Sequence, residues 1–449
     1  MKLGLMKIVS AVAVLSLTYP TQTDATNGYF KHGYGARSES MGGVGVALAF
    51  DGLTPATNPA GIAGMDNRLD VGMTMFNPIR GATFDTSGLG GGPSSDDSAE
   101  TFFVIPELGV VRNAGRVTLG FSLFGNGGMN TTYERNVFDQ GFYGPAGSGA
   151  PDTETLGVDL AQLLISTSVA YRIGSRHDVG ASLVLGYQRF EAYGLGNFQC
   201  FTATANSTPD CASGNPPVVL SSNLTNQGVD DAAGVGVRLG WLGRVSPGVS
   251  LGATYASKIY MQRFDKYREL FADGGSFDIP ANLALGLALE VTPRFHAALD
   301  LQHIFYSDVP AVGNPGPTAA ELIGGAMTPE RLLGASQGIG FGWKDMTVFK
   351  LGFRYLHPSG VTFLHGISYG TDPIHHDESL FAILAPAVIR THLTAGIAYA
   401  DRRNGGLTIG YTHALREDQQ RTYFLGPASY TAKLGMNQRA LRLDYAWKF

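Results

Sequence analysis

The sequence has few charged residues and no long apolar run. Asp, Glu, Lys and Arg make up 15% of its 449 residues, whereas soluble proteins average about 25%. Beyond the first 25 residues no stretch of 18 apolar residues occurs, which excludes a helical membrane protein. The net charge of -5 argues against a nucleic-acid partner, because such proteins neutralise phosphates with Lys and Arg.

Cysteine is scarce, and the two cysteines lie close together. Cys200 and Cys211 flank a polar stretch rich in Thr, Asn and Ala. In a secreted chain such a pair predicts one disulfide that closes a small loop, worth roughly 3 kcal/mol in the chain-entropy model. A metal site is the alternative, but no histidine or further cysteine lies nearby to complete a ligand set.

The first 25 residues have the pattern of a secretory signal peptide. Lys2 and Lys7 provide its positive charge, and residues 8–17 form an apolar core too short to span a bilayer. Thr23-Asp24-Ala25 offers a cleavage site, so we expect the mature chain to start at Thr26. The alternative is a short membrane anchor, which no other apolar run supports.

The sequence does contain many glycines and segments in which apolar and polar residues alternate. Glycine is abundant, at 61 residues, near twice the average share of about 7%. The chain ends in a strand whose apolar side consists of Leu441, Leu443, Tyr445, Trp447 and Phe449. Its other side carries Arg442, Asp444 and Lys448. Bacterial outer-membrane barrels have strands of this kind, apolar toward lipid and polar toward the lumen.

The same alternation recurs along the chain. Residues 283–291 and 295–302 flank a Thr292-Pro293 turn and predict a hairpin. The predicted strands are residues 68–81, 101–112, 115–130, 158–173, 178–193, 229–245, 249–265, 277–292, 294–309, 346–357, 361–371, 389–401, 405–417 and 435–449. Long polar loops are predicted at residues 82–100, 131–157, 194–228, 266–276, 310–345, 372–388 and 418–434. The resulting number of strands, fourteen, is even, as in single-chain bacterial barrels.

Residues 26–67 precede the first strand and lack sustained alternation. The segment is rich in Gly and Ala, so we expect it to enter the barrel as a plug. The predicted organisation is therefore a signal peptide (residues 1–25), an N-terminal hatch (residues 26–67) and a transmembrane β-barrel (residues 68–449).

Three groups of motifs resemble the FadL/TodX family of outer-membrane transporters for hydrophobic compounds. The first comprises Gly35-x-Arg37, Met41-Gly42-Gly43, Asp51 and Asn58-Pro59-Ala60-Gly61. The second runs from Ile279-Pro280-Ala281-Asn282 to Phe305-Tyr306, and the third from Trp343-Lys344-Asp345 to Gly370-Thr371-Asp372-Pro373-Ile374. The second departs from the family at His303-Ile304, where a tryptophan is expected, and this leaves substrate choice in doubt rather than the fold.

The resemblance implies an all-β fold: a 14-stranded antiparallel transmembrane barrel, plugged by a small N-terminal hatch, in the bacterial outer membrane. It also implies passive uptake of hydrophobic small molecules, either long-chain fatty acids or aromatic hydrocarbons. The expected partners are this cargo and outer-membrane lipids. No cofactor, metal or nucleic acid is expected, and the chain is expected to be a monomer.

The resemblance also assigns roles to residues. The hatch motif comprises Asp51, Asn58, Pro59 and Gly61. A kink in the third strand, which opens a hole in the wall for lateral exit of cargo, is placed at Gly125, Gly127 and Gly128. Alternatively, these glycines end the strand at an outer loop, since glycine serves both purposes. Candidate residues lining the cargo path are Tyr29, Phe30, Phe121 and Phe124.

Other functions remain open. A phospholipase-like barrel enzyme would need a nucleophile and a base within hydrogen-bond reach, but His365 and Ser368 lie on opposite parities of one strand. A surface adhesin is a further alternative, whereas a general porin fits less well because the hatch would block the lumen. The His375-His376 pair is interpreted as part of a solvated loop, since adjacent histidines in an extended chain point apart.

Overall fold

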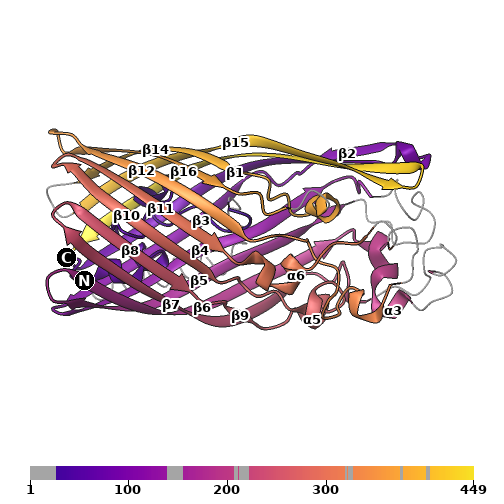
Figure 1. The fold of residues 1–449 in the computed structure, drawn as a ribbon, viewed down its shortest axis with the longest axis horizontal. Coiled ribbons are helices and arrows are strands. Elements are labelled where there is room, and N and C mark those ends of the chain that lie inside the picture. The colour runs from indigo at the N-terminus through magenta and orange to yellow at the C-terminus, as the bar shows by residue number, and fades with distance from the viewer. Residues whose placement is uncertain are drawn as a thin grey trace.

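The chain forms a closed, single-layered cylinder of antiparallel strands (Figure 1). The computed structural model describes residues 27–138, 155–206, 211, 222–318, 321, 327–374, 378–400 and 405–449. Sixteen strands belong to one sheet, and the last strand, β16, pairs back to the first, β1. Two of the sixteen, β2 and β9, only extend the pairing of their neighbours, so the wall has fourteen strands and the predicted fold class is confirmed.

The strands run up and down in sequence order. The wall strands are β1 (Arg68–Asp85), β3 (Phe103–Ala114), β4 (Val117–Tyr133), β5 (Leu156–Ile173), β6 (His177–Tyr193), β7 (Asp230–Ser246), β8 (Val249–Ala256), β10 (Asn282–Thr292), β11 (Phe295–Ile304), β12 (Met346–Leu356), β13 (Val361–Gly370), β14 (Thr391–Ala400), β15 (Gly405–Leu425) and β16 (Ala428–Lys448). β2 (Pro93–Asp97) pairs with the end of β1, and β9 (Tyr260–Met261) pairs with β7.

Helices are short and lie in two places. The N-terminal segment, residues 27–67, contains α2 (Ala36–Glu39), η1 (Thr54–Ala56) and η2 (Pro59–Ile62). The long loops contain η3 (Ser87–Leu89), η4 (Gly196–Phe201), α3 (Ala203–Asn206), η5 (Asp265–Tyr267), α5 (Ala272–Gly275), η6 (Tyr306–Asp308), α6 (Pro310–Gly313), η7 (Pro329–Arg331) and α8 (Ser379–Ala382). Of the helices in the described residues, none has the length and apolar character needed to span a bilayer.

Most strands were correctly predicted from alternation, but several boundaries were wrong. The strand predicted at residues 277–292 begins at Asn282, and the one predicted at residues 294–309 ends at Ile304. The strand predicted at residues 249–265 ends at Ala256. The loop predicted at residues 418–434 belongs to the final hairpin, in which β15 and β16 stay paired up to Leu425 and Ala428 and turn at Gly426. Residues 416–422 are polar throughout. This part of the hairpin therefore lacks the alternation that a strand shows when only one of its faces meets an apolar environment.

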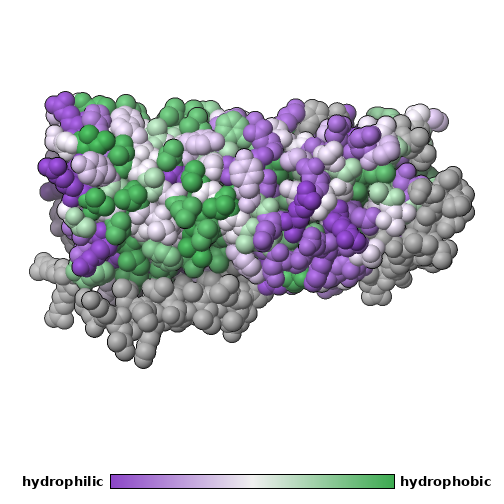
Figure 2. Space-filling view, turned by 90° about the horizontal axis from the view of Figure 1, so that it is seen from below, coloured by the Kyte–Doolittle hydropathy of each residue, from purple (hydrophilic) through white to green (hydrophobic). Residues whose placement is uncertain are grey.

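On the face that Figure 2 shows, apolar side chains form a band over the half of the barrel where the C-terminus lies (Figures 1 and 2). We call this end the short-turn end and the opposite end the long-loop end. Outward side chains in the band are exposed, for example Leu239 (53%), Leu285 (51%) and Ile397 (50%). In the last strand Trp447 is 43% exposed, whereas Arg442 is 2% exposed. The exposed apolar face and enclosed charged residue match the predicted alternation and the outer-membrane interpretation.

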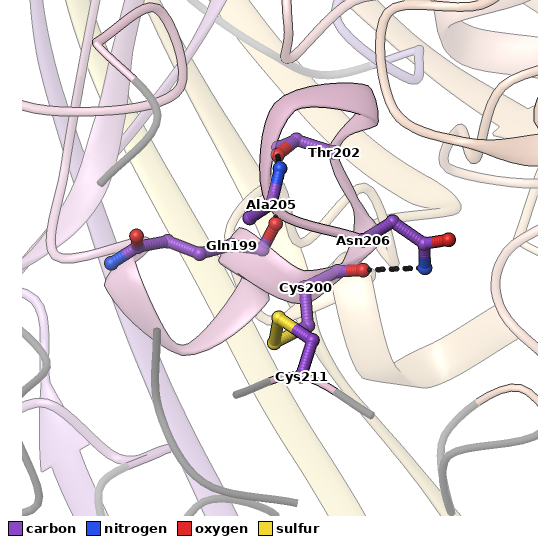
Figure 3. Close-up of a disulfide and its surroundings, with 6 residues drawn as sticks. All are labelled: Gln199, Cys200, Thr202, Ala205, Asn206 and Cys211. Carbon is purple, nitrogen blue, oxygen red and sulfur yellow. Dashed lines mark hydrogen bonds between the residues drawn. A yellow bond between two sulfur atoms is a disulfide. The ribbon is translucent and has the colours of Figure 1, made fainter. Parts of the chain in front are cut away.

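The predicted disulfide is confirmed at the long-loop end. Cys200 in η4 is bonded to Cys211, with 5.5 Å between their Cα atoms (Figure 3). Local hydrogen bonds hold the same turn: Asn206 donates from Nδ2 to the carbonyl of Cys200 at 2.9 Å, and Thr202 donates from Oγ1 to the carbonyl of Gln199 at 2.8 Å. The predicted signal peptide and His375-His376 lie outside the described residues.

Candidate functional site

The N-terminal segment lies inside the barrel, and inward carboxylates hold its backbone. Asp70 of β1 accepts a hydrogen bond from the backbone N–H of Gly52 at 2.8 Å. Asp300 of β11 accepts from two consecutive N–H groups, of Gly45 at 2.7 Å and of Val46 at 3.0 Å. Because this segment has little regular structure to pair its own backbone groups, the wall provides partners for them.

A buried network of four charges joins the segment to the wall. Lys31 forms ion pairs with Glu39 at 2.9 Å and with Glu107 of β3 at 2.5 Å, and Arg442 of β16 pairs with both carboxylates. The four side chains are at most 4% exposed. Burial alone would raise the pKa of Glu39, but Arg442 and Lys31 outweigh it and hold that pKa at about 2. Lys31 and Arg442 thus neutralise Glu39 and Glu107 away from water, and Arg442 also pairs with Asp444 of its own strand at 3.3 Å.

The residues of the predicted hatch motif organise the segment itself. Asn58 donates from Nδ2 to the carbonyls of Val46 at 2.7 Å and Trp241 at 3.0 Å. Its Oδ1 accepts from the N–H of Ala60 at 3.0 Å, and so caps η2 with Pro59 at the first helical position.

The two remaining motif residues pack within the same segment. Asp51 caps the turn by accepting from Leu53 at 2.9 Å, and burial together with the neighbouring Asp70 raises the pKa of Asp51 to about 7. At Gly61 a Cβ atom would lie 2.6 Å from the methyl carbon of Thr54. The motif therefore fixes the internal folding of the segment.

Inward glycines let the segment approach the wall closely. A Cβ atom built on the wall glycine would lie under 3 Å from an atom of the N-terminal segment at Gly109, Gly120, Gly180, Gly240, Gly252, Gly286, Gly352, Gly366, Gly396 and Gly410. Several of them are direct cross-strand partners, including Gly252 with Gly286 and Gly352 with Gly366. This glycine ring explains part of the high glycine content, since larger inward residues would exclude the segment.

Substitution of one ring glycine should weaken docking of the segment. At Gly366 a Cβ atom would lie 2.2 Å from backbone atoms of Met41 and Gly42, which cannot rotate away. We expect Gly366→Ala to cost about 1–3 kcal/mol of docking free energy, measured as faster proteolysis within residues 27–67 of the purified barrel. Gly92→Ala is the control, because no atom lies within 4 Å of its added Cβ. Equal protection in both variants would contradict the role of the ring.

The wall is irregular where β3 and β4 should meet. Their pairing ends at Leu108 and Leu123, although β4 continues to Tyr133. The ladder between β4 and β5 shifts register between Gly125 and Gly127, and every one of residues 122–131 is buried. The three glycines therefore lie within the strand rather than at its end, and β4 separates from β3 while it stays paired with β5 up to Tyr133.

The N-terminal segment replaces β3 as the partner of β4 there. Phe30 forms a bridge with Gly127. The N–H of Gly128 donates to the carbonyl of Tyr29 at 3.0 Å, and the N–H of Lys31 donates to the carbonyl of Asn126 at 2.8 Å. We call the place where β4 separates from β3 the seam.

Three of the four predicted lining residues lie together on the inner side of the seam. Tyr29 and Phe30 contact Tyr306, with ring centroids 5.1 Å and 5.8 Å away. Phe124 packs edge-on against Tyr34 at 4.7 Å. Phe121 shares the outward parity of the exposed Leu119, so it faces away from the lumen.

Two cavities lie between the N-terminal segment and the long-loop end of the barrel. The outer cavity comprises about 560 Å³ of space between atoms, part of it open to solvent, and is lined by Met129, Val158, Phe190, Leu195, Phe198, Leu270, Phe271, Ala311, Leu333, Ile339, Gly340, Phe341, Phe381 and Leu384. The seam cavity holds about 330 Å³ and is lined by Gly28, Phe76, Arg80, Gly128, Met129, Asn130, Trp343, residues 385–387 and Met436. Met129 lines both, so the two cavities are neighbours. The outer cavity has no charged residue in its lining.

Sequence reasoning missed most of these lining residues. The outer cavity is assembled from strand ends and from four long loops that are far apart in the sequence. Single apolar residues in polar loops, such as Leu333 and Ile339, were the signal available. Arg80 could have been found as a charged residue of inward parity in β1, as Arg442 was in β16.

Comparisons with known proteins agree with this architecture. A family model described as outer membrane protein transport protein (OMPP1/FadL/TodX) matches residues 30–424. The structure is similar to the toluene transporter TodX of Pseudomonas putida, with a TM-score of 0.67, 20% identity, and coverage of 93% of this chain and 99% of that chain. A search of curated proteins found no match.

Two further solved structures share the fold. The toluene transporter TbuX of Ralstonia pickettii has a TM-score of 0.60 and 18% identity, covering 93% of this chain and 99% of that one. A FadL homologue of Pseudomonas aeruginosa has a TM-score of 0.64 and 13% identity, covering 94% of this chain and 100% of that one. At these identities the likeness concerns the fold alone.

Proposed function

The chain belongs to the OMPP1/FadL/TodX family of outer membrane transport proteins, and from this premise we propose that it takes up hydrophobic small molecules by lateral exit through the seam. The cargo would be a long-chain fatty acid or an aromatic hydrocarbon. In the outer membrane, the short-turn end faces the periplasm and the long loops face the outside of the cell. The N-terminal segment acts as the hatch, and residues 27–67 are its extent.

The observation that carries the proposal is the apolar outer cavity. It lies among the outside loops, and its lining consists almost wholly of hydrophobic side chains. Such a cavity favours apolar molecules over water because each buried methylene contributes about 0.8 kcal/mol. Its neighbour, the seam cavity, lies beside the part of β4 that has separated from β3. Cargo that moves from one cavity to the next would thus reach the seam.

Lateral exit avoids the largest energetic cost of transport. A 16-carbon chain released into the aqueous periplasm would forfeit on the order of 10 kcal/mol of hydrophobic stabilisation. Movement through the seam into the bilayer keeps the chain in apolar surroundings throughout. Residues 27–31 pair with β4 at this place, so a small displacement of the N-terminal segment would open the path and no energy source would be needed.

An enzymatic function has one structural observation in its favour. Ser368 Oγ lies 3.2 Å from His392 Nδ1, within hydrogen-bond reach. Both side chains are almost completely buried, and the His392 ring stacks on His32 of the N-terminal segment at 5.3 Å. A substrate could not reach this serine without removal of the segment, and the family consists of transport proteins, so we favour transport.

An uptake assay tests the proposal. Cells that lack their own outer-membrane transporter for hydrophobic compounds are given this chain, and entry of labelled hexadecanoate and of labelled toluene is followed over time. We expect at least one of them to enter faster than in cells with an empty vector. Intact label is checked by chromatography, because hydrolysis of lipid would indicate an enzyme. Uptake equal to the vector control for both compounds would refute the proposal.

A further inference from the structure

The seam cavity contains three buried polar residues whose nitrogen donors have no partner. Arg80 Nε, Trp343 Nε1 and Asn130 Nδ2 each lack a hydrogen-bond acceptor among the described residues, and all three residues line this one cavity. Their exposed fractions are 4%, 1% and 8%. Buried donors are paired in the great majority of cases, so three unpaired donors around one cavity indicate a missing acceptor.

The positive charge of Arg80 indicates whether the missing acceptor is neutral or anionic. Its two terminal nitrogens donate to the backbone carbonyls of Asn130 and Glu100, and its guanidinium lies over the ring of Phe103 at 5.7 Å. Neither interaction supplies a negative charge. The carboxylates of Glu100 and Asp159 act on Arg80 electrostatically, but neither forms an ion pair with it in the part of the chain that the structure describes. Buried charges are normally paired, which favours an anionic acceptor.

The remainder of the cavity fits an apolar tail. Phe76, Met129 and Met436 contribute apolar surface to the lining, together with residues 385–387. Met129 also lines the outer cavity, which has no charged residue. A molecule with one anionic end at Arg80 could therefore extend its tail past Met129 into apolar surroundings.

We propose that Arg80, Trp343 and Asn130 bind the carboxylate head group of an amphiphilic cargo, and that they select long-chain acids over neutral hydrocarbons. This inference rests on the proposed transport function. A carboxylate offers two oxygens with about four acceptor positions, enough for all three donors. A neutral hydrocarbon would leave every donor unpaired and the guanidinium without a counter-charge.

The test compares an acid with its neutral ester. Binding of hexadecanoate and of methyl hexadecanoate to the purified barrel is measured in detergent at pH 7.5. We expect the wild type to bind the acid roughly 10- to 100-fold more tightly than the ester, the range for a hydrogen bond to a charged group. Arg80→Gln should bring the ratio near one and leave ester binding unchanged. Trp343→Phe keeps an aromatic ring but removes the indole N–H, and it should reduce the ratio of acid to ester affinity by several-fold.

Arg238→Gln is the matched control. It removes a different lumenal arginine that is buried and does not line the seam cavity. Heat-dependent migration in electrophoresis verifies that each variant is folded, and Trp343→Phe keeps the test valid if Arg80→Gln does not fold. An unchanged ratio in the Arg80 and Trp343 variants, or an equal loss in Arg238→Gln, would overturn the assignment. Ester binding with no preference for the acid refutes only this inference, whereas binding of neither compound, together with toluene uptake equal to the vector control, refutes the transport proposal as well.

Discussion

Arg442→Met is expected to release the N-terminal segment from the wall. Arg442 of β16 contacts Glu39 and Glu107, and it also pairs with Asp444 on its own strand. Its loss leaves Glu39 and Glu107 with only Lys31 to neutralise them and removes the ion pair of Asp444. Removal of one member of a buried ion pair typically costs 3–5 kcal/mol. We expect rapid proteolysis of residues 27–67 and larger single-channel currents in planar bilayers.

A second substitution tests whether the effect of Arg442→Met comes from the unpaired charge or from the change in side-chain shape. Glu107→Gln in the Arg442→Met background removes one of the carboxylates that Arg442 neutralised, and Lys31 and Glu39 then remain as a pair 2.9 Å apart. We expect the double variant to recover much of the protection lost by the single variant. If the single variant is as protected as the wild type, or if the second substitution brings no recovery, the network does not hold the segment.

Deletion of Asn126 is expected to abolish uptake while leaving a folded barrel. Asn126 is the extra residue at the register shift, since Gly125 pairs with Leu163 and Gly127 with Gln162. Without it the β4–β5 ladder would be continuous, which removes the local bend that a bulge imposes. β4 would then stay beside β3 and close the seam. We expect uptake of labelled cargo to fall to the level of vector-only cells, with binding to the purified protein retained.

Asn126→Ala is the control for this deletion. It removes the hydrogen bonds of the Asn126 side chain with Tyr34 at 3.0 Å and Gln162 at 2.8 Å, but keeps the extra residue. We expect it to retain uptake. Wild-type uptake by the deletion variant would contradict lateral exit through the seam. Loss of uptake in both variants would instead assign the effect to the side chain of Asn126. A large residue at Gly127 would be a poorer test, because its Cβ would collide with the backbone of Tyr29 and displace the N-terminal segment.

The alternation of apolar and polar residues made the strands of the barrel predictable. The prediction failed where a strand lacks this alternation. Strands such as β10 face lipid with Leu285 and the interior with Ala284, so their sequence carries a period of two. The ends of β15 and β16 extend beyond the apolar band, and residues 416–422 of β15 are polar on both faces, so no such period remains in that strand. Local patterns therefore identified the membrane part of the wall better than its outer extension.

The candidate site was less predictable because it is built from distant parts of the chain. The partner of Arg442 in β3, Glu107, is 335 residues away in the sequence, and no local pattern couples them. The seam cavity likewise joins β1, β4, β16 and two loops. The inward position of Arg442 could be predicted from parity, but its partners depend on how the N-terminal segment folds inside the barrel.

The closure of the wall and the docking of the N-terminal segment are thermodynamically linked. β1 and β16 pair along all 18 residues of β1, and the segment bridges the same two strands, since Asp70 of β1 accepts from Gly52 and Asp444 of β16 accepts from Ala36 at 2.5 Å. By reciprocity, whatever free energy the docked segment adds to the junction, the junction adds to docking. The first and last strands are thus held together partly by cooperativity with the N-terminal segment, and any change that displaces this segment also weakens the closure of the barrel.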